Sequence, residues 1–178
     1  MKKTLMILCV MIFFSMGING FARLTGNWDF GLLSYGSPPV SGYKGALGGI
    51  AGLFEVGLGI DLSVEEDVSE IQLRMDFGVY SWENDSNTFG SGDYNRLPFF
   101  IGPRVYLYLS DDVLIYGEAG FEISFDDFAV KETNFGVTPG AGFELRFGGS
   151  GVFGVKFRYH LIQDSYFAIG PYFGWKYN

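Results

Sequence analysis

The chain has 178 residues, a net charge of −8, 27 glycines, 19% aromatic residues and a single cysteine. Its acidity excludes binding to a phosphate backbone, which needs clustered Lys and Arg, so we expect no nucleic-acid partner. The aromatic content excludes a disordered chain. Together with the many glycines it favours β-structure with numerous turns and tight bends.

The first 22 residues differ from the rest. Lys2 and Lys3 precede an apolar run at 5–16, and small residues occupy the −3 and −1 positions before a cleavage point after Ala22. This pattern predicts a secretory signal peptide over residues 1–22. The run is too short for a membrane-spanning helix, which needs about 20 apolar residues.

The remaining residues, 23–178, are predicted to form one domain. Cys9 lies inside the predicted leader, so the mature chain is expected to lack cysteine, which excludes disulfides and thiol chemistry. After the leader we find no sustained helical periodicity. Alternation with a period of two recurs instead, and it predicts eight strands at about 25–35, 49–62, 70–82, 94–109, 113–125, 134–147, 151–161 and 166–177.

Each predicted strand has one apolar and one polar face, because successive side chains point to opposite sides of a sheet. In 113–125, one face carries Val113, Ile115 and Phe121, whereas the other carries Glu118 and Glu122. A soluble barrel would place the bulky apolar face in its core. A membrane barrel reverses this arrangement, with apolar residues toward lipid and polar residues in the lumen.

The charges of the polar face favour the membrane barrel, because they balance although the chain is acidic. We count seven acids and seven bases on this face, namely Asp29, Glu55, Asp61, Asp76, Glu118, Glu122 and Glu144 with Arg74, Arg96, Arg104, Arg146, Lys156, Arg158 and Lys176. An interior needs such balance since each buried charge needs a partner. The predicted lumen network consists of Arg74, Asp76, Arg96, Arg104, Glu118, Glu122, Glu144, Arg146, Lys156, Arg158 and His160.

The predicted fold is therefore an all-β, closed, antiparallel, up-and-down transmembrane barrel of about eight strands. Closure is required because lipid cannot satisfy an open sheet edge. Eight strands give a small barrel that side chains just fill. An even number of strands places both mature termini on the periplasmic side, together with the tight turns at 110–112 and 148–150.

Two stretches, "VTPGAGFELRFGGSGVFGVKFRYHL" (137–161) and "YFAIGPYFGWKYN" (166–178), carry a family resemblance. The chain resembles the small outer-membrane β-barrel proteins of Gram-negative bacteria, the superfamily that includes the OmpA-type membrane domain. The resemblance implies residence in the outer membrane among lipids and lipopolysaccharide, and insertion by the outer-membrane assembly machinery. The resemblance supports the fold more than a function. Our hypothesis is that the charge network plugs the lumen and that the protein has a role in envelope integrity or surface interaction; the alternative is a small pore or solute transporter.

Two further hypotheses concern an enzyme and a secreted binding protein. His160, with Asp164 and Ser165 nearby, suggests a lipid A-modifying barrel enzyme, but the spacing does not match the known arrangements, and we predict no enzymatic activity. Gly26-x-Trp28 is similar to the first-strand signature of lipocalins, which line their interior with apolar residues, unlike this chain. The acidic connectors lack the ligand spacing of an EF-hand, so we expect no metal and no cofactor.

Overall fold

The computed structural model describes residues 26–36, 43–45, 50–62, 69–84, 94–126 and 132–177. The predicted signal peptide lies outside these residues. Within them the chain forms β1 (Gly26–Gly36), β2 (Tyr43–Gly45), β3 (Ile50–Asp61), β4 (Ser69–Asn84), β5 (Tyr94–Tyr108), β6 (Val113–Asp126), β7 (Glu132–Phe147), β8 (Gly151–His160) and β9 (Tyr166–Tyr177).

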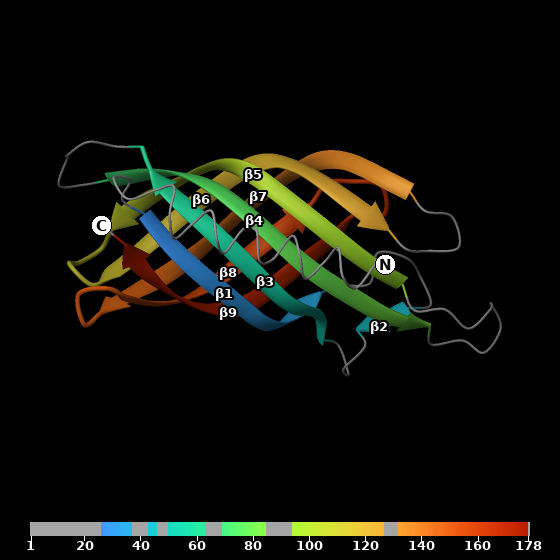
Figure 1. The fold of residues 1–178 in the computed structure, drawn as a ribbon, viewed down its shortest axis with the longest axis horizontal. Helices are drawn as coiled ribbons and strands as arrows, with labels where there is room; N and C mark the ends of the chain where they lie inside the picture. Colours follow the sequence, from blue (N-terminus) through green and yellow to red (C-terminus); the bar gives the residue numbers. More distant parts are fainter. Residues whose placement is uncertain are drawn as a thin grey trace.

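The eight long strands form one closed antiparallel barrel, which confirms the predicted fold (Figure 1). Their order around the wall is β4-β3-β1-β9-β8-β7-β6-β5, and the pairing of β4 with β5 closes the sheet. The bounds of the eight long strands differ from the predicted ones by at most two residues. The short β2 was not predicted; it lies in the first long connector and pairs with the far end of β4 through Tyr43 and Asn84. Among the described residues, no helix is long and apolar enough to cross a membrane.

The two ends of the barrel differ. At one end, which we call the turn end, β1 begins, β9 ends, and the tight connectors 109–112 and 148–150 join neighbouring strands. Gly148 and Gly149 have φ angles of 59° and 79°, in the left-handed region that glycine adopts without steric cost. We call the opposite end, which carries the connector 161–165, the loop end.

The wall has the inverted polarity of a membrane barrel. Outward apolar side chains are exposed, as Phe121 (73%) and Phe135 (71%) illustrate, whereas the inward residues Arg74 and Arg104 are 0% exposed. The alternation in sequence causes this polarity, since the burial of β6 alternates residue by residue.

Glycines on the inner face make room for the arginines. A Cβ on Gly57 would collide with Nη2 of Arg74, and one on Gly59 would collide with Oδ1 of Asn27. Small residues on β3 therefore let long side chains of β4 fold flat across the lumen. The narrow interior of an eight-stranded barrel is filled in this way.

Candidate functional site: the lumen network

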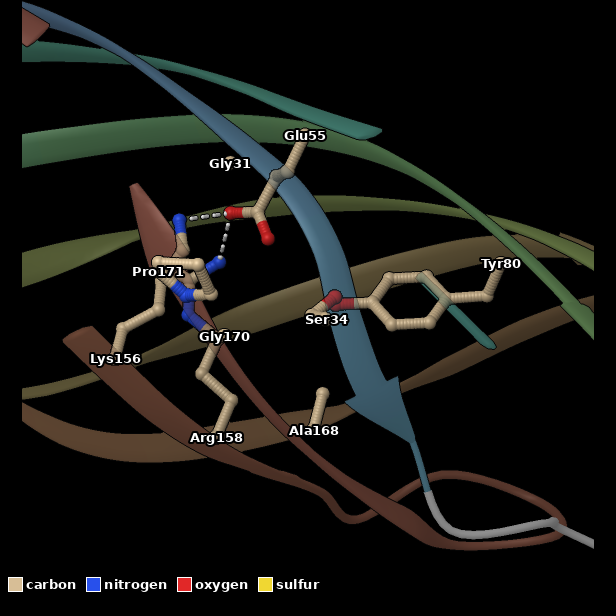
Figure 2. A pocket seen from close by; sticks show the side chains of 9 residues that line it. All are labelled: Gly31, Ser34, Glu55, Tyr80, Lys156, Arg158, Ala168, Gly170 and Pro171. Carbon is tan, nitrogen blue, oxygen red and sulfur yellow. Dashed lines mark hydrogen bonds and ion pairs between the residues drawn. The ribbon is translucent and has the colours of Figure 1, made fainter. Parts of the chain in front are cut away.

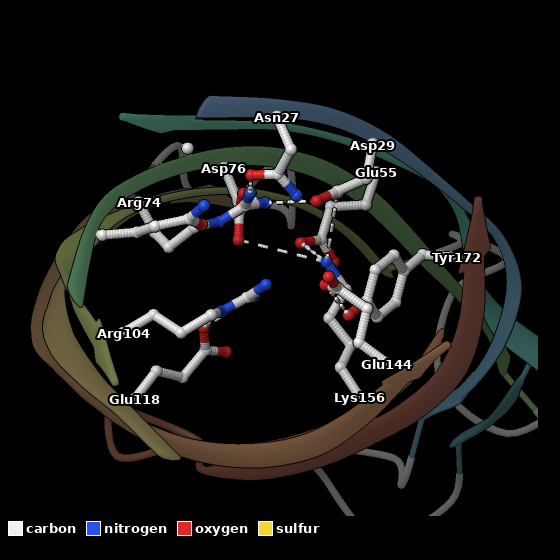
Figure 3. Close-up of polar contacts among 12 residues, drawn as sticks. Asn27, Asp29, Glu55, Arg74, Asp76, Arg104, Glu118, Glu144, Lys156 and Tyr172 are labelled. Atoms are coloured by element: carbon white, nitrogen blue, oxygen red, sulfur yellow. Dashed lines mark hydrogen bonds and ion pairs between the residues drawn. The ribbon is translucent and has the colours of Figure 1, made fainter. Parts of the chain in front are cut away.

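The candidate site is the lumen itself, where charged side chains from all parts of the wall converge (Figure 3). We distinguish three levels along the barrel axis: a central belt, a turn-end cluster and a loop-end cluster. The central belt consists of four cations and four carboxylates, namely Arg74, Arg104, Lys156 and Arg158 with Asp29, Glu55, Asp76 and Glu118.

Arg74, from β4, holds the β1 side of the central belt. Its guanidinium donates to Asn27 Oδ1 at 3.1 Å, to Asp29 Oδ2 at 2.7 Å and to Asp76 Oδ1 at 2.6 Å. The two aspartates lie on β1 and on β4 itself, so the arginine ties these strands together across the inner face. Such charge-assisted hydrogen bonds are roughly twice as strong as neutral ones.

Glu118, from β6, joins two arginines of the belt. Arg104 Nε donates to its Oε2 at 2.8 Å, and Arg158 Nε donates to its Oε1 at 2.6 Å. Arg158 also donates to Asp76 and, at 2.9 Å, to Glu55. Lys156 Nζ lies 2.5 Å from the same Glu55 oxygen. Arg158 therefore contacts carboxylates from three different strands and spans the lumen.

Aromatic rings cover the faces of these cations. The guanidinium carbon of Arg104 lies 4.0 Å from the centre of the Tyr116 ring, and that of Arg158 lies 4.2 Å from the centre of the Phe100 ring. A cation in this position is attracted by the negative face of the ring, and the effect increases when water is excluded. The rings also occupy space that water would otherwise fill.

The turn-end cluster has two carboxylate centres. Glu70 accepts hydrogen bonds from Tyr108 at 2.7 Å, Arg146 at 2.9 Å and Lys176 at 3.2 Å. Glu144 accepts from Arg146 at 3.0 Å. On its other side, Glu144 also accepts from the hydroxyls of Tyr106 and Tyr172, both at 3.0 Å. These tyrosines separate the turn-end cluster from the belt.

The loop-end cluster joins polar and aromatic side chains. Arg96 donates to both carboxylate oxygens of Asp126, at 2.8 and 2.6 Å. His160 Nδ1 lies 2.5 Å from Glu122 Oε2, and Thr138 Oγ1 donates to the same oxygen. The histidine ring stacks on Tyr166 with 4.1 Å between ring centroids and 3° between planes.

All eleven residues named for the network from the sequence point into the lumen, buried or nearly so. The predicted balance of seven acids and seven bases is wrong, however: Glu70 and Asp126 also face inward, so the described part of the inner face carries nine acids and seven bases. Both lie at strand ends, and Asp126 lies one residue beyond the predicted strand 113–125. Glu70 is two residues from Gln72, and Asp126 is two residues from Ser124. The period of two therefore predicts that both acids lie on the inner face, if the alternation is followed to the observed ends of the strands.

Described side chains fill the lumen at the level of the belt, where Arg74 and Arg104 are fully buried, and Arg96 is fully buried in the loop-end cluster. Small cavities remain among these side chains; two of them have a volume of about 10 Å³ each, which is about the space that one water molecule needs. Among the described residues, no group of three His, Cys, Asp or Glu side chains is arranged to hold a metal ion.

A closed barrel with an apolar outer wall and a charged, filled lumen is a transmembrane β-barrel. The chain matches no protein-family model and no curated protein sequence. Solved structures identify the fold as that of the small outer-membrane barrels.

Three of these structures illustrate the likeness. The attachment invasion locus protein Ail of Yersinia pestis, solved with the heparin analogue sucrose octasulfate, is 13% identical with a TM-score of 0.59, over 86% of this chain and 99% of that chain. Neisserial surface protein A is 11% identical with a TM-score of 0.53, over 86% and 97% of the two chains. The outer membrane protein OprG of Pseudomonas aeruginosa is 12% identical with a TM-score of 0.51, over 87% and 95%.

Proposed function

We propose that the protein is an integral outer-membrane barrel with a sealed lumen, which contributes to envelope integrity or presents its external loops to partners. The observation that carries this proposal is the burial of the belt cations, each of which lies at ion-pair distance from at least one belt carboxylate. Water cannot reach Arg74 or Arg104, so the ion pairs act as a plug. Lipid and lipopolysaccharide would surround the wall, and the outer-membrane assembly machinery would insert it with both mature termini in the periplasm.

The alternative of a small pore or solute transporter needs cations and carboxylates on separate walls with water between them. In the belt they instead lie at ion-pair distance, as Arg104 and Glu118 do at 2.7 Å. Such a pair is costly to separate once it is buried. The geometry therefore favours the plug over the pore.

Ail was solved in complex with a heparin analogue, which is a polyanion. The described residues of this chain do not support a polyanion-binding surface. Every Lys and Arg whose side chain the structure describes lies on the lumen face. At the loop end, Glu132 and Asp164 are exposed. A partner of the described rim would thus meet carboxylates rather than cations.

The lipid A-modifying enzyme finds no support in the described contacts of its candidate residues. His160 pairs with Glu122, whereas the hydroxyl of Ser165 donates to the carbonyl of Ile162 at 2.9 Å within its own turn. The described inner face is charged, whereas a lipocalin lines its interior with apolar residues.

Solute uptake by proteoliposomes tests the proposal. Vesicles that contain the folded protein, verified by heat-modifiable gel mobility, should swell in an isotonic sugar solution no faster than protein-free vesicles. Rapid swelling would establish an open lumen and refute the plug. A mature protein that stays soluble without detergent would refute the membrane placement.

A further inference from the structure

The connector between β8 and β9 folds back over the loop end of the lumen. Leu161 and Val137 exchange backbone hydrogen bonds at 2.9 and 3.3 Å. Asp164 has a φ of 55°, a left-handed conformation that Asp tolerates better than most residues. Ser165 Oγ closes the turn by donating to the Ile162 carbonyl. These contacts give the connector a defined shape.

One side chain, Arg96 from β5, fastens this connector to the opposite wall. Its guanidinium donates to the carbonyls of Gln163 and Asp164, both at 3.1 Å. The same group binds Asp126 through two further hydrogen bonds and lies 5.2 Å from the centre of the Tyr166 ring. The guanidinium group of Arg96 therefore contacts the connector, β6 and β9 at the same time.

An aromatic layer lies under the connector. Ile162 is buried among Tyr80, Trp82 and Tyr166. The Tyr166 ring lies edge-on to Trp82 at 5.2 Å and to Tyr80 at 5.4 Å, and it stacks on His160. Such aromatic pairs pack well, and the ion pair of His160 with Glu122 at this level is separate from the belt pairs.

The two small cavities lie beneath this layer and share Glu55, Tyr80 and Arg158 as lining residues. The first cavity is bounded on the β1 and β9 side by residues with little or no side chain, including Gly31 and Gly170 (Figure 2). Below both cavities, the belt and the tyrosines close the lumen. The space between the aromatic layer and the belt is thus a small vestibule.

We propose that residues 161–166 form a movable lid over this vestibule, and that Arg96 is its latch. The latch holds Asp126, whereas the belt arginines hold Asp29, Asp76, Glu55 and Glu118. Release of the lid therefore leaves the belt pairs in place. The vestibule then opens to water and small solutes on the loop side, while the barrel remains closed to through-flow. The inference rests on the sealed belt proposed above.

Reactivity of a thiol introduced into the vestibule tests the lid. Gly31 suits this purpose, because a Cβ there would lie 3.5 Å from its nearest neighbours, an ordinary contact. In a Cys9→Ser background, the Gly31→Cys variant is treated with a small hydrophilic methanethiosulfonate reagent. The Ser150→Cys variant, whose substitution lies in an exposed turn, gives the rate of a freely accessible thiol.

The vestibule thiol of Gly31→Cys should react much more slowly than the turn thiol of Ser150→Cys. Adding Arg96→Ala should raise the vestibule rate by roughly tenfold or more, since the closed lid loses its charge-assisted hydrogen bonds. Adding Arg146→Ala, which removes a lumen arginine at the turn end, should leave the rate unchanged. Arg96→Lys keeps the positive charge but lacks the guanidinium group, so it should give an intermediate rate. This variant replaces Arg96→Ala in the test if Arg96→Ala does not fold.

If the thiol of Gly31→Cys reacts at an unchanged rate in folded Arg96 variants, the lid proposal is wrong. It is also wrong if Arg146→Ala raises this rate as much as Arg96→Ala does, because the whole barrel would then have become less rigid. A vestibule thiol that reacts as fast as the turn thiol while Arg96 is intact would also overturn the proposal. Steady ionic current through the unsubstituted protein would instead refute the sealed belt. The two failures are therefore distinguishable.

Discussion

Substitution of Arg158 tests how much the ion pairs of the central belt contribute to the stability of the barrel. The Arg158 guanidinium, 3% exposed, contacts Glu55, Asp76 and Glu118. Arg158→Met keeps most of the bulk but leaves four carboxylates facing three cations. Breaking a buried ion pair by removing one partner costs about 3–5 kcal/mol, because the remaining charge is buried without compensation. We therefore expect the free energy of unfolding to fall by about that amount.

Urea titration of the protein folded in lipid vesicles measures this change, with heat-modifiable gel mobility as the readout. Lys176→Met is the matched control, since Lys176 is 24% exposed and pairs only with Glu70 among its described contacts. We expect a loss of about 1 kcal/mol or less there. The double variant Arg158→Met/Glu118→Gln should be less destabilised than the sum of its parts, by about 0.5–3 kcal/mol. A loss below about 1 kcal/mol for Arg158→Met, with additive effects, would mean that water solvates the belt, and would refute the reasoning.

Three further outcomes are expected. Gly57→Ala should destabilise the barrel by about 1–3 kcal/mol, because its Cβ would press on Arg74, whereas Gly31→Ala should be neutral; equal urea midpoints for the two would contradict the close packing. Phe121→Arg should cost about 2–4 kcal/mol on the lipid face, against little for an exposed Asp112→Arg, and a tolerated Phe121→Arg would argue against lipid contact there. His160→Ala should leave the lipid A profile of cells unchanged in mass spectrometry, and a lost modification would revive the enzyme.

The wall could be predicted from the sequence because its determinant is local. Alternation along 113–125 assigns each side chain to lipid or lumen without knowledge of its neighbours, and the structure follows it. Alternation defines the ends of strands less sharply, because connectors interrupt it there. For this reason the predicted inner face does not include Glu70 and Asp126.

The partners within the lumen could not be predicted. Glu118 meets Arg158, which is 40 residues away, because the stagger of the strands brings them to the same level, and alternation carries no information on stagger. Register shifts add to this. The pairing of β1 with β9 shifts between Gly31 and Tyr35, and that of β1 with β3 shifts between Ser34 and Tyr35.

Single-channel recording in planar bilayers tests the sealed lumen most directly. The folded protein, inserted at moderate ionic strength, should produce no stable conductance steps, because Arg74, Arg104 and Arg158 remain paired with carboxylates inside the lumen. Large, long-lived currents from the same preparation would show a continuous water path and would contradict the plug.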